Sequence, residues 1–195
     1  MVARRDPKIA YVALLAGPGV PGDAIIMAQQ SAILRAVGAP PAMVAERAAQ
    51  ERRVLDAIER APDHASAVAG AAKELRAMGV PEAQIDAQAR QVGSDWFRFF
   101  LTYDPAPALR ALHIPVLAMI GSKDLQVPAE QNLPALRAAL ADNPRATVVE
   151  LPGLNHLFQT AKTGAPTEYG QIAEHVSPVA LDRLADWIKR QGAER

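Results

Sequence analysis

The sequence predicts an α/β protein in which a parallel sheet is interrupted by a long all-helical insertion. Three apolar segments, 9–16, 114–120 and 146–151, have the composition of short strands, the first two most clearly of strands buried on both faces. A segment with helical spacing separates the second strand from the third, as a crossover between parallel strands requires. The stretch 23–112 shows no strand pattern at all.

The first segment reads IAYVALLA and leads into the turn Gly17–Gly22, GPGVPG. This turn matches the dinucleotide-binding pattern G-x-G-x-x-G and follows a predicted strand. Pro21, however, disfavours helical geometry at Val20, where a phosphate-binding helix should begin. No second strand ending in an acidic residue follows at the required distance. We therefore interpret the turn as a tight, rigid exit from the strand into the insertion.

The insertion contains runs of apolar residues at helical spacing, separated by proline and glycine at 40–41, 61–63 and 79–81. The runs are Val44, Ala48, Leu55 and Ile58; Val68, Ala72, Leu75 and Met78; and Ile85, Ala89, Val92, Trp96 and Phe99 or Phe100. We expect three or four helices here. Residues 23–112 then form a helical cap, and residues 1–22 and 113–195 form the sheet-containing core.

Two helices complete the predicted core. The stretch 128–141 carries leucines on one helical face, at positions 133, 136 and 140. After the third strand, Ser177 and Pro178 suit the N-cap and first position of a final helix. Its apolar side is expected to comprise Leu181, Leu184 and Ile188.

Composition excludes several functional classes. Lys plus Arg equals Asp plus Glu at 21 each, so net charge points neither to nucleic acid nor to an anionic membrane. There are no cysteines, which excludes disulfides, thiolate metal sites and a cysteine nucleophile. No apolar run reaches the length of a membrane span, roughly 18 residues. Nothing in the sequence implies a metal or an organic cofactor, and nothing indicates a cellular compartment.

The chemistry-bearing residues are Asp124 and His156, each directly after a predicted strand. Asp124 follows 114–120 in GSKD, and His156 follows 146–151 in PGLNH. Taken alone, each has an ordinary explanation, a helix-capping carboxylate and a loop histidine. Because parallel strands end at one edge of a sheet, the two should meet, and the carboxylate should accept the Nδ1–H of the imidazole. The order and spacing predict the last two members of a Ser-Asp-His triad.

Four segments together resemble the C-terminal half of a bacterial α/β-hydrolase of the branch that includes serine esterases and serine-aminopeptidase-like enzymes with a helical cap. They are 14–22, 95–105, 114–128 and 151–169, so the similarity spans essentially the whole chain. The resemblance implies that Asp124 is the triad acid and His156 the triad base. It also implies that five strands, the nucleophile elbow and the oxyanion hole belong to residues preceding this chain.

No G-x-S-x-G turn occurs in the sequence. Ser122 lies on the acid's own loop, and the other serines fall in predicted helices, their connections or a cap. We therefore expect a small-molecule ester substrate, acyl transfer to a serine outside the chain, and an isolated chain without activity. The strand 9–16 would leave one edge free, which predicts self-association or pairing with the N-terminal half of the same hydrolase.

An aromatic cluster at 95–105 supplies the candidate substrate-binding residues Trp96, Phe97, Phe100 and Tyr103. Simple packing of a helix is the competing explanation for these rings. Two other functions remain open at this point. One is a non-catalytic assembly domain with an incidental Asp-His pair, and the other is the same fold with an Asp nucleophile or with peptidase activity.

Overall fold

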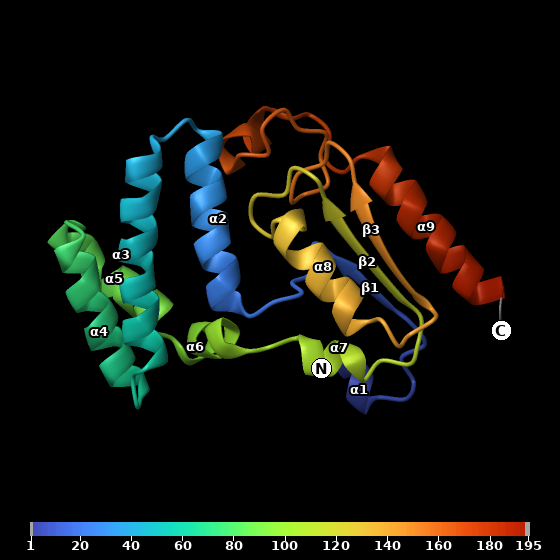
Figure 1. The fold of residues 1–195 in the computed structure, drawn as a ribbon, viewed down its shortest axis with the longest axis horizontal. Helices are drawn as coiled ribbons and strands as arrows, with labels where there is room; N and C mark the ends of the chain where they lie inside the picture. Colours follow the sequence, from blue (N-terminus) through green and yellow to red (C-terminus); the bar gives the residue numbers. More distant parts are fainter. Residues whose placement is uncertain (1, 194–195) are drawn as a thin grey trace. The chain divides into compact units, whose positions relative to one another are not determined.

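The computed structural model describes residues 2–193 and contains a three-stranded parallel sheet and many helices, an α/β architecture (Figure 1). The chain forms two compact units. One comprises Met1–Val20 and Pro105–Arg195 and holds the sheet, and the other is the helical unit Pro21–Asp104. The predicted boundaries at 22 and 113 differ from this division chiefly at the second junction, because a short helix, α7 (Ala106–Arg110), belongs to the sheet unit.

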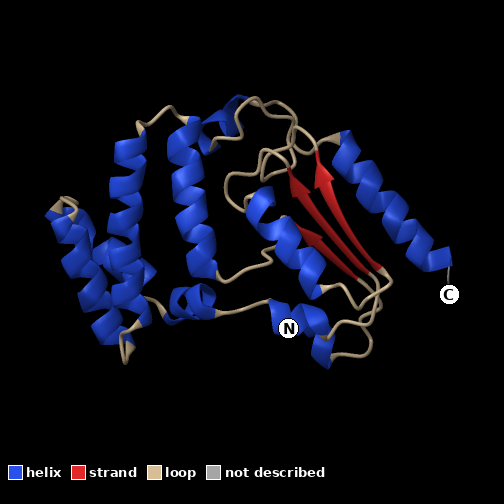
Figure 2. Cartoon of the chain, in the orientation of Figure 1, coloured by secondary structure: helices blue, strands red, loops and turns tan. Residues whose placement is uncertain are grey.

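The sheet has the order β1-β2-β3, with all strands parallel (Figure 2). β1 is Val12–Leu15, β2 is Val116–Gly121 and β3 is Ala146–Leu151. All three predicted strands are therefore confirmed, β3 with the predicted bounds. β1 is shorter than predicted. Val12 donates to the Pro115 carbonyl at 3.0 Å, and Pro115, which lacks an N–H, cannot extend the ladder toward residue 9.

Burial on both faces holds for β2 alone. Every residue of β2 is buried, as expected for the middle strand. The prediction of full burial is wrong for β1, whose Leu15 is 48% exposed and whose other residues are half-buried. In the described part of the chain β1 and β3 are the outer strands, and an outer strand has a neighbour on one side only.

The turn after β1 is rigid because it packs closely on a helix of the same unit, α8 (Ala129–Ala139). The Gly19 amide donates to Asn132 Oδ1 at 2.8 Å, and a Cβ on Gly19 would lie 2.7 Å from the Asn132 carbonyl oxygen. A glycine is required at this contact. The predicted packing face of α8 is confirmed, since Leu133, Leu136 and the C-cap Leu140 are all buried.

The last helix, α9 (Pro178–Ala193), starts at the predicted residue, and two of its three predicted core residues, Leu184 and Ile188, pack as expected. Ala180, Leu184, Trp187 and Ile188 pack with Leu117 and Met119 of β2. Leu181, predicted to be inward, is 51% exposed. Ala180 and Trp187 complete the buried side of the helix, and Trp187 meets Tyr11 edge-on at 5.5 Å. The sheet unit also contains α1 (Val2–Arg5) and the 3-10 helix η1 (Pro166–Gln171).

The helical unit contains no strand among its described residues, as predicted, but it has more helices than the three or four expected. They are α2 (Gly22–Ala36), α3 (Pro41–Glu59), α4 (His64–Ala77), α5 (Glu82–Val92) and α6 (Asp95–Thr102). The core of the unit lies among α3, α4 and α5, with Leu55, Ile58 and Ile85 almost fully buried.

The extra helix arises where one continuous helix was predicted over 85–100. Gly93 is buried, and a Cβ there would lie 2.8 Å from both the Ala89 carbonyl oxygen and the Val68 side chain. Ser94 then caps α6 by accepting from the Phe97 amide at 3.3 Å. The break changes the helical phase, so Phe97 and Phe100 turn toward the core while Trp96 is 70% exposed.

Candidate functional site

Two loops meet at the carboxyl ends of β2 and β3 and carry the predicted pair. Asp124 Oδ2 lies 2.9 Å from His156 Nδ1, which confirms the predicted hydrogen bond. The other carboxylate oxygen, Oδ1, accepts from the backbone amides of Gln126 at 2.9 Å and Val127 at 2.8 Å. The Asp124 side chain is fully buried, and that of His156 is 27% exposed. The Asp124 carboxylate is thus buried and held by two backbone amides, and the imidazole of His156 reaches the surface.

The loop after β2, residues 121–127, is here called the acid loop, and the loop after β3, residues 151–159, the histidine loop. Hydrogen bonds to the histidine loop position the acid loop. The amides of Ser122 and Lys123 donate to the carbonyls of Leu151 and Leu154, each at 2.9 Å. Gly121, directly before Ser122, lies so close to the histidine loop that a Cβ would be 2.1 Å from the Leu154 carbonyl oxygen. The glycine of the GSKD segment therefore allows the two loops to touch.

His156 occupies a tight turn built by Asn155. The fully buried Asn155 side chain accepts from the amides of Leu157 and Gln159, each at 2.9 Å, and donates to Gln159 Oε1. Phe158 has a φ of 58°, in the left-handed region that favours glycine, yet its ring is buried in the cluster between the sheet and α9. The buried ring holds the strained turn and so fixes the direction of His156.

The geometry leaves one nitrogen of the imidazole available. With Nδ1 bonded to a carboxylate, the proton of the neutral ring resides on Nδ1 and Nε2 carries the lone pair. Among the described residues, Nε2 of His156 has no hydrogen-bond partner. Such an arrangement can remove a proton from a group placed before Nε2, and the carboxylate stabilises the imidazolium that forms.

A further loop, residues 160–169, contacts the acid loop, and its role was not predicted. Lys123 donates from Nζ to the carbonyls of Ala161 and Lys162, each at 2.8 Å. Gln126 donates from Nε2 to the Tyr169 hydroxyl at 3.0 Å. Burial is the main cause that raises the pKa of Tyr169 above its ordinary value. These contacts join residues far apart in sequence, and no local pattern signals them.

The Glu168 side chain forms hydrogen bonds within the loop 160–169. Its carboxylate accepts from the Thr163 hydroxyl and from the amides of Lys162, Thr163 and Gly164. The Thr163 hydroxyl and then the Lys162 amide are the largest causes that lower the pKa of Glu168, to about 2. Glu168 is therefore ionised throughout the neutral pH range.

The structure places serine hydroxyls of the sheet unit away from Nε2. Ser122 Oγ accepts from the Gly153 amide at 2.8 Å and so joins the two loops. Ser177 is buried where α9 begins, and its amide donates to the Phe158 carbonyl at 2.8 Å. Among the described residues, no serine hydroxyl is hydrogen-bonded to His156.

The predicted substrate-binding residues all lie on or directly after α6 in the helical unit. Trp96 stacks on Phe100 at 5.6 Å with the ring planes 3° apart, and Phe97 lies against both. Phe97 and Phe100 pack against the core of the helical unit, and Tyr103 lies beside Phe99 at 5.1 Å. Trp96 is the most exposed of the four, so it is the ring most accessible to a ligand.

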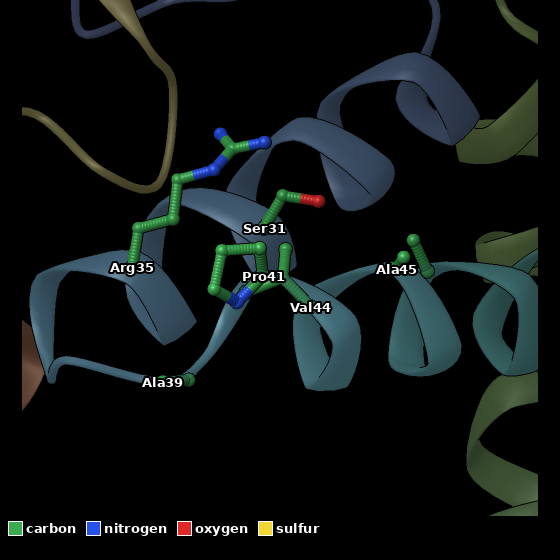
Figure 3. Close-up of a pocket in the computed structure, with 7 residues that line it drawn as sticks. Ser31, Arg35, Ala39, Pro41, Val44 and Ala45 are labelled. Carbon is green, nitrogen blue, oxygen red and sulfur yellow. The ribbon is translucent and has the colours of Figure 1, made fainter.

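The helical unit also carries a cavity of about 290 Å³ between α2 and α3 (Figure 3). Ser31 and Arg35 of α2 and Pro41, Val44 and Ala45 of α3 line it, together with Ala39 and Ala48. None of the four aromatic candidates contributes to its lining.

Comparison with known proteins leaves the site to be interpreted from its own geometry. No protein-family model matches the sequence, and no curated protein matches it. Within residues 2–193, no group of three or more His, Asp or Glu residues is arranged to hold a metal ion. No helix in that part of the chain is long and apolar enough to cross a membrane.

Proposed function

We propose that this chain contributes the acid and the base of a serine-type carboxylic ester hydrolase of the α/β-hydrolase class. The observation that carries the proposal is the 2.9 Å bond between the buried Asp124 carboxylate and His156 Nδ1, at the carboxyl ends of neighbouring parallel strands. The helical unit Pro21–Asp104 is, in this proposal, the cap of the enzyme. Trp96, Phe97, Phe100 and Tyr103 are the candidates for contacting the apolar part of the ester.

The chemistry follows from the free nitrogen of His156. Nε2 takes the proton of a serine hydroxyl as its oxygen attacks the ester carbonyl carbon, and Asp124 stabilises the imidazolium. The imidazolium then gives its proton to the departing alkoxide, leaving an acyl-serine. In the second half, Nε2 takes a proton from water, the hydroxide displaces the serine, and the serine oxygen recovers the proton. His156 is thus general base and general acid in turn.

The nucleophilic serine in this scheme comes from residues outside the 195. The sequence has no G-x-S-x-G turn, and Ser122 is engaged with the Gly153 amide on the acid's own loop. An oxyanion hole of the α/β-hydrolase type also requires the residue after the nucleophile and an earlier loop. The isolated chain is therefore expected to show no turnover of esters.

The test begins with the DNA directly upstream of the codon for Met1. The proposal expects an in-frame segment with a G-x-S-x-G turn. The chain joined to that segment should hydrolyse p-nitrophenyl acetate, and His156→Ala should lower kcat by a factor on the order of 10⁴ or more. His175→Ala, which removes an exposed histidine of the sheet unit, is the matched control and should leave the rate unchanged.

Two results would overturn the proposal. One is equal activity of the joined chain with and without His156. The other is robust turnover by the isolated chain that Ser122→Ala abolishes, because Ser122 would then be the nucleophile.

The outer edge of β1 favours a second candidate role, in assembly. β1 pairs with β2 on one side, and the described residues place no strand on its other side. Leu15 of β1 is 48% exposed. A free parallel edge with an exposed leucine accepts a further strand. We propose that a strand of the nucleophile-bearing segment pairs with this edge of β1. The alternative outcome of a test is pairing with a second copy of this chain.

A further inference from the structure

The loop that follows His156 contains a peptide turn held between two opposite charges. On one side, the carbonyls of Ala161 and Lys162 accept from the ammonium group of Lys123, each at 2.8 Å. On the other side, Glu168 accepts the amides that follow, with Thr163 at 2.9 Å and Gly164 at 3.0 Å. The two ionised side chains do not bond to each other. The turn 161–164 lies between them, with its carbonyls toward the cation and its amides toward the anion.

The same loop contacts both flanks of Asp124. Lys123 is the residue directly before the acid, and its carbonyl oxygen lies 1.9 Å from where a Cβ on Gly164 would be, so the loops touch through the glycine. Gln126, two residues after the acid, donates one amide proton to Asp124 Oδ1 and another, from its side chain, to Tyr169. Tyr169 directly follows Glu168 in sequence.

The loop also continues the hairpin that carries the histidine. Leu154 and Thr160 form an isolated antiparallel bridge, and the Ala161 amide donates to the Gly153 carbonyl at 3.0 Å. His156 lies in the turn between Leu154 and Thr160. The turn 161–164 therefore connects directly to the base and, through Lys123, to the acid.

From this arrangement we infer that Lys123 and Glu168 are positioning residues that hold the Asp124 loop and the His156 hairpin at bonding distance. The inference rests on the proposed function for its catalytic meaning, and it deepens that function by assigning two residues to the same site. Neither side chain bonds to His156. Their effect on the base is transmitted through the turn 161–164 and the backbone on each side of the acid.

The hydrogen bonds to the turn 161–164 are strong because Lys123 and Glu168 are ionised. Hydrogen bonds with one ionised partner are roughly twice as strong as those between neutral groups. Two ions placed on opposite ends of the same peptide groups also polarise those groups in one direction. Removal of either ion leaves the turn with neutral partners or water, and the acid loop loses one of its anchors to the hairpin.

The tautomer of His156 reports whether Nδ1 still donates to Asp124. It can be measured without any nucleophile or substrate. In the wild-type chain, long-range ¹H–¹⁵N correlation spectra should show His156 mainly as the Nδ1–H form, because Nδ1 donates to Asp124. Free imidazole side chains favour the Nε2–H form instead. In Lys123→Met and in Glu168→Gln we expect the ratio of Nδ1–H to Nε2–H to fall by about tenfold or more, the scale of losing one charge-assisted bond. His156→Ala assigns the signals.

Three further variants make the test specific. Lys123→Arg keeps a cation and should restore the wild-type ratio at least in part, whereas a merely space-filling role would be met equally by methionine. Tyr169→Phe removes a single hydroxyl, so it folds even if the charge variants do not, and it should shift the ratio in the same direction. Lys162→Met removes an exposed lysine of the same loop and should change nothing.

The inference is wrong if Lys123→Met and Glu168→Gln fold and leave the His156 tautomer as in the wild type, or if Tyr169→Phe has no effect where they do not fold. This outcome is independent of the ester assay. If the joined chain is inactive but the variants still shift the tautomer of His156, only the proposed function is wrong. If the joined chain is active but the variants do not shift the tautomer, only the positioning role is wrong.

Discussion

Replacing Gly121 by alanine tests whether contact between the two loops sets the site. The added Cβ would lie 2.1 Å from the Leu154 carbonyl oxygen, 2.6 Å from the carbonyl carbon and 2.9 Å from the Asn155 carbonyl oxygen. All three atoms are backbone and cannot rotate away. An ordinary contact begins at 3.4 Å, so the loops must separate by about 1.3 Å.

That separation has two measurable consequences. Overpacking of this kind costs about 1–3 kcal/mol, and the upper end applies here because backbone faces backbone. The bond from Asp124 to His156, now 2.9 Å, would also stretch beyond hydrogen-bonding range if the movement passes along the loops. We expect Gly121→Ala to lower the urea midpoint of unfolding and to shift His156 toward the Nε2–H form.

Gly170→Ala is the matched control, since a Cβ there meets nothing within 4 Å and φ lies outside the positive range. Its free energy of unfolding should stay within about 0.5 kcal/mol of the wild type. If Gly121→Ala is as stable as this control and keeps the Nδ1–H tautomer, the loops do not set the geometry by close contact.

Three other predictions concern Asp124, Glu168 and the outer edge of β1. Asp124→Asn keeps an oxygen for the two backbone amides but turns an NH₂ group toward Nδ1, so we expect the Nε2–H tautomer and a loss of about 1.5–3 kcal/mol in unfolding free energy; Asp182→Asn, on the exposed side of α9, should have no effect, and equal urea midpoints for both would contradict the assignment. Glu168 has a folded-state pKa lowered from 4.5 to about 2, so the stability it contributes is complete above the unfolded value and is lost as pH falls through about 2. Glu168→Gln should therefore unfold at lower urea than the wild type at pH 6, with the difference shrinking toward pH 2, and a constant difference would refute the linkage. Val12→Lys should weaken association through the β1 edge, and light scattering that shows a wild-type monomer at high concentration would remove the basis for that edge contact.

Several elements could be predicted because their signals are local. β3 is a short run of β-branched and apolar residues ending in Leu151, and its bounds need no knowledge of its neighbours. The meeting of Asp124 and His156 was also predictable, because parallel strands in sequence end at the same edge of a sheet. The end of α5 was missed, since apolar spacing continues through Gly93 and only the packing of that glycine against Val68 shows the break.

The sequence by itself therefore determined the class of the fold, the strands, and the meeting of Asp124 with His156, since each depends on residue type and order along the chain. The tertiary structure alone decided that Ala180 and Trp187 complete the buried side of α9 with the predicted Leu184 and Ile188, while Leu181 is exposed. The tertiary structure alone also revealed the hydrogen bonds of Lys123 and Glu168. Lys123 and the carbonyls that it contacts lie far apart in the sequence, so no local pattern signals them. The Glu168 bonds lie within one loop, and they form only when that loop folds back on itself.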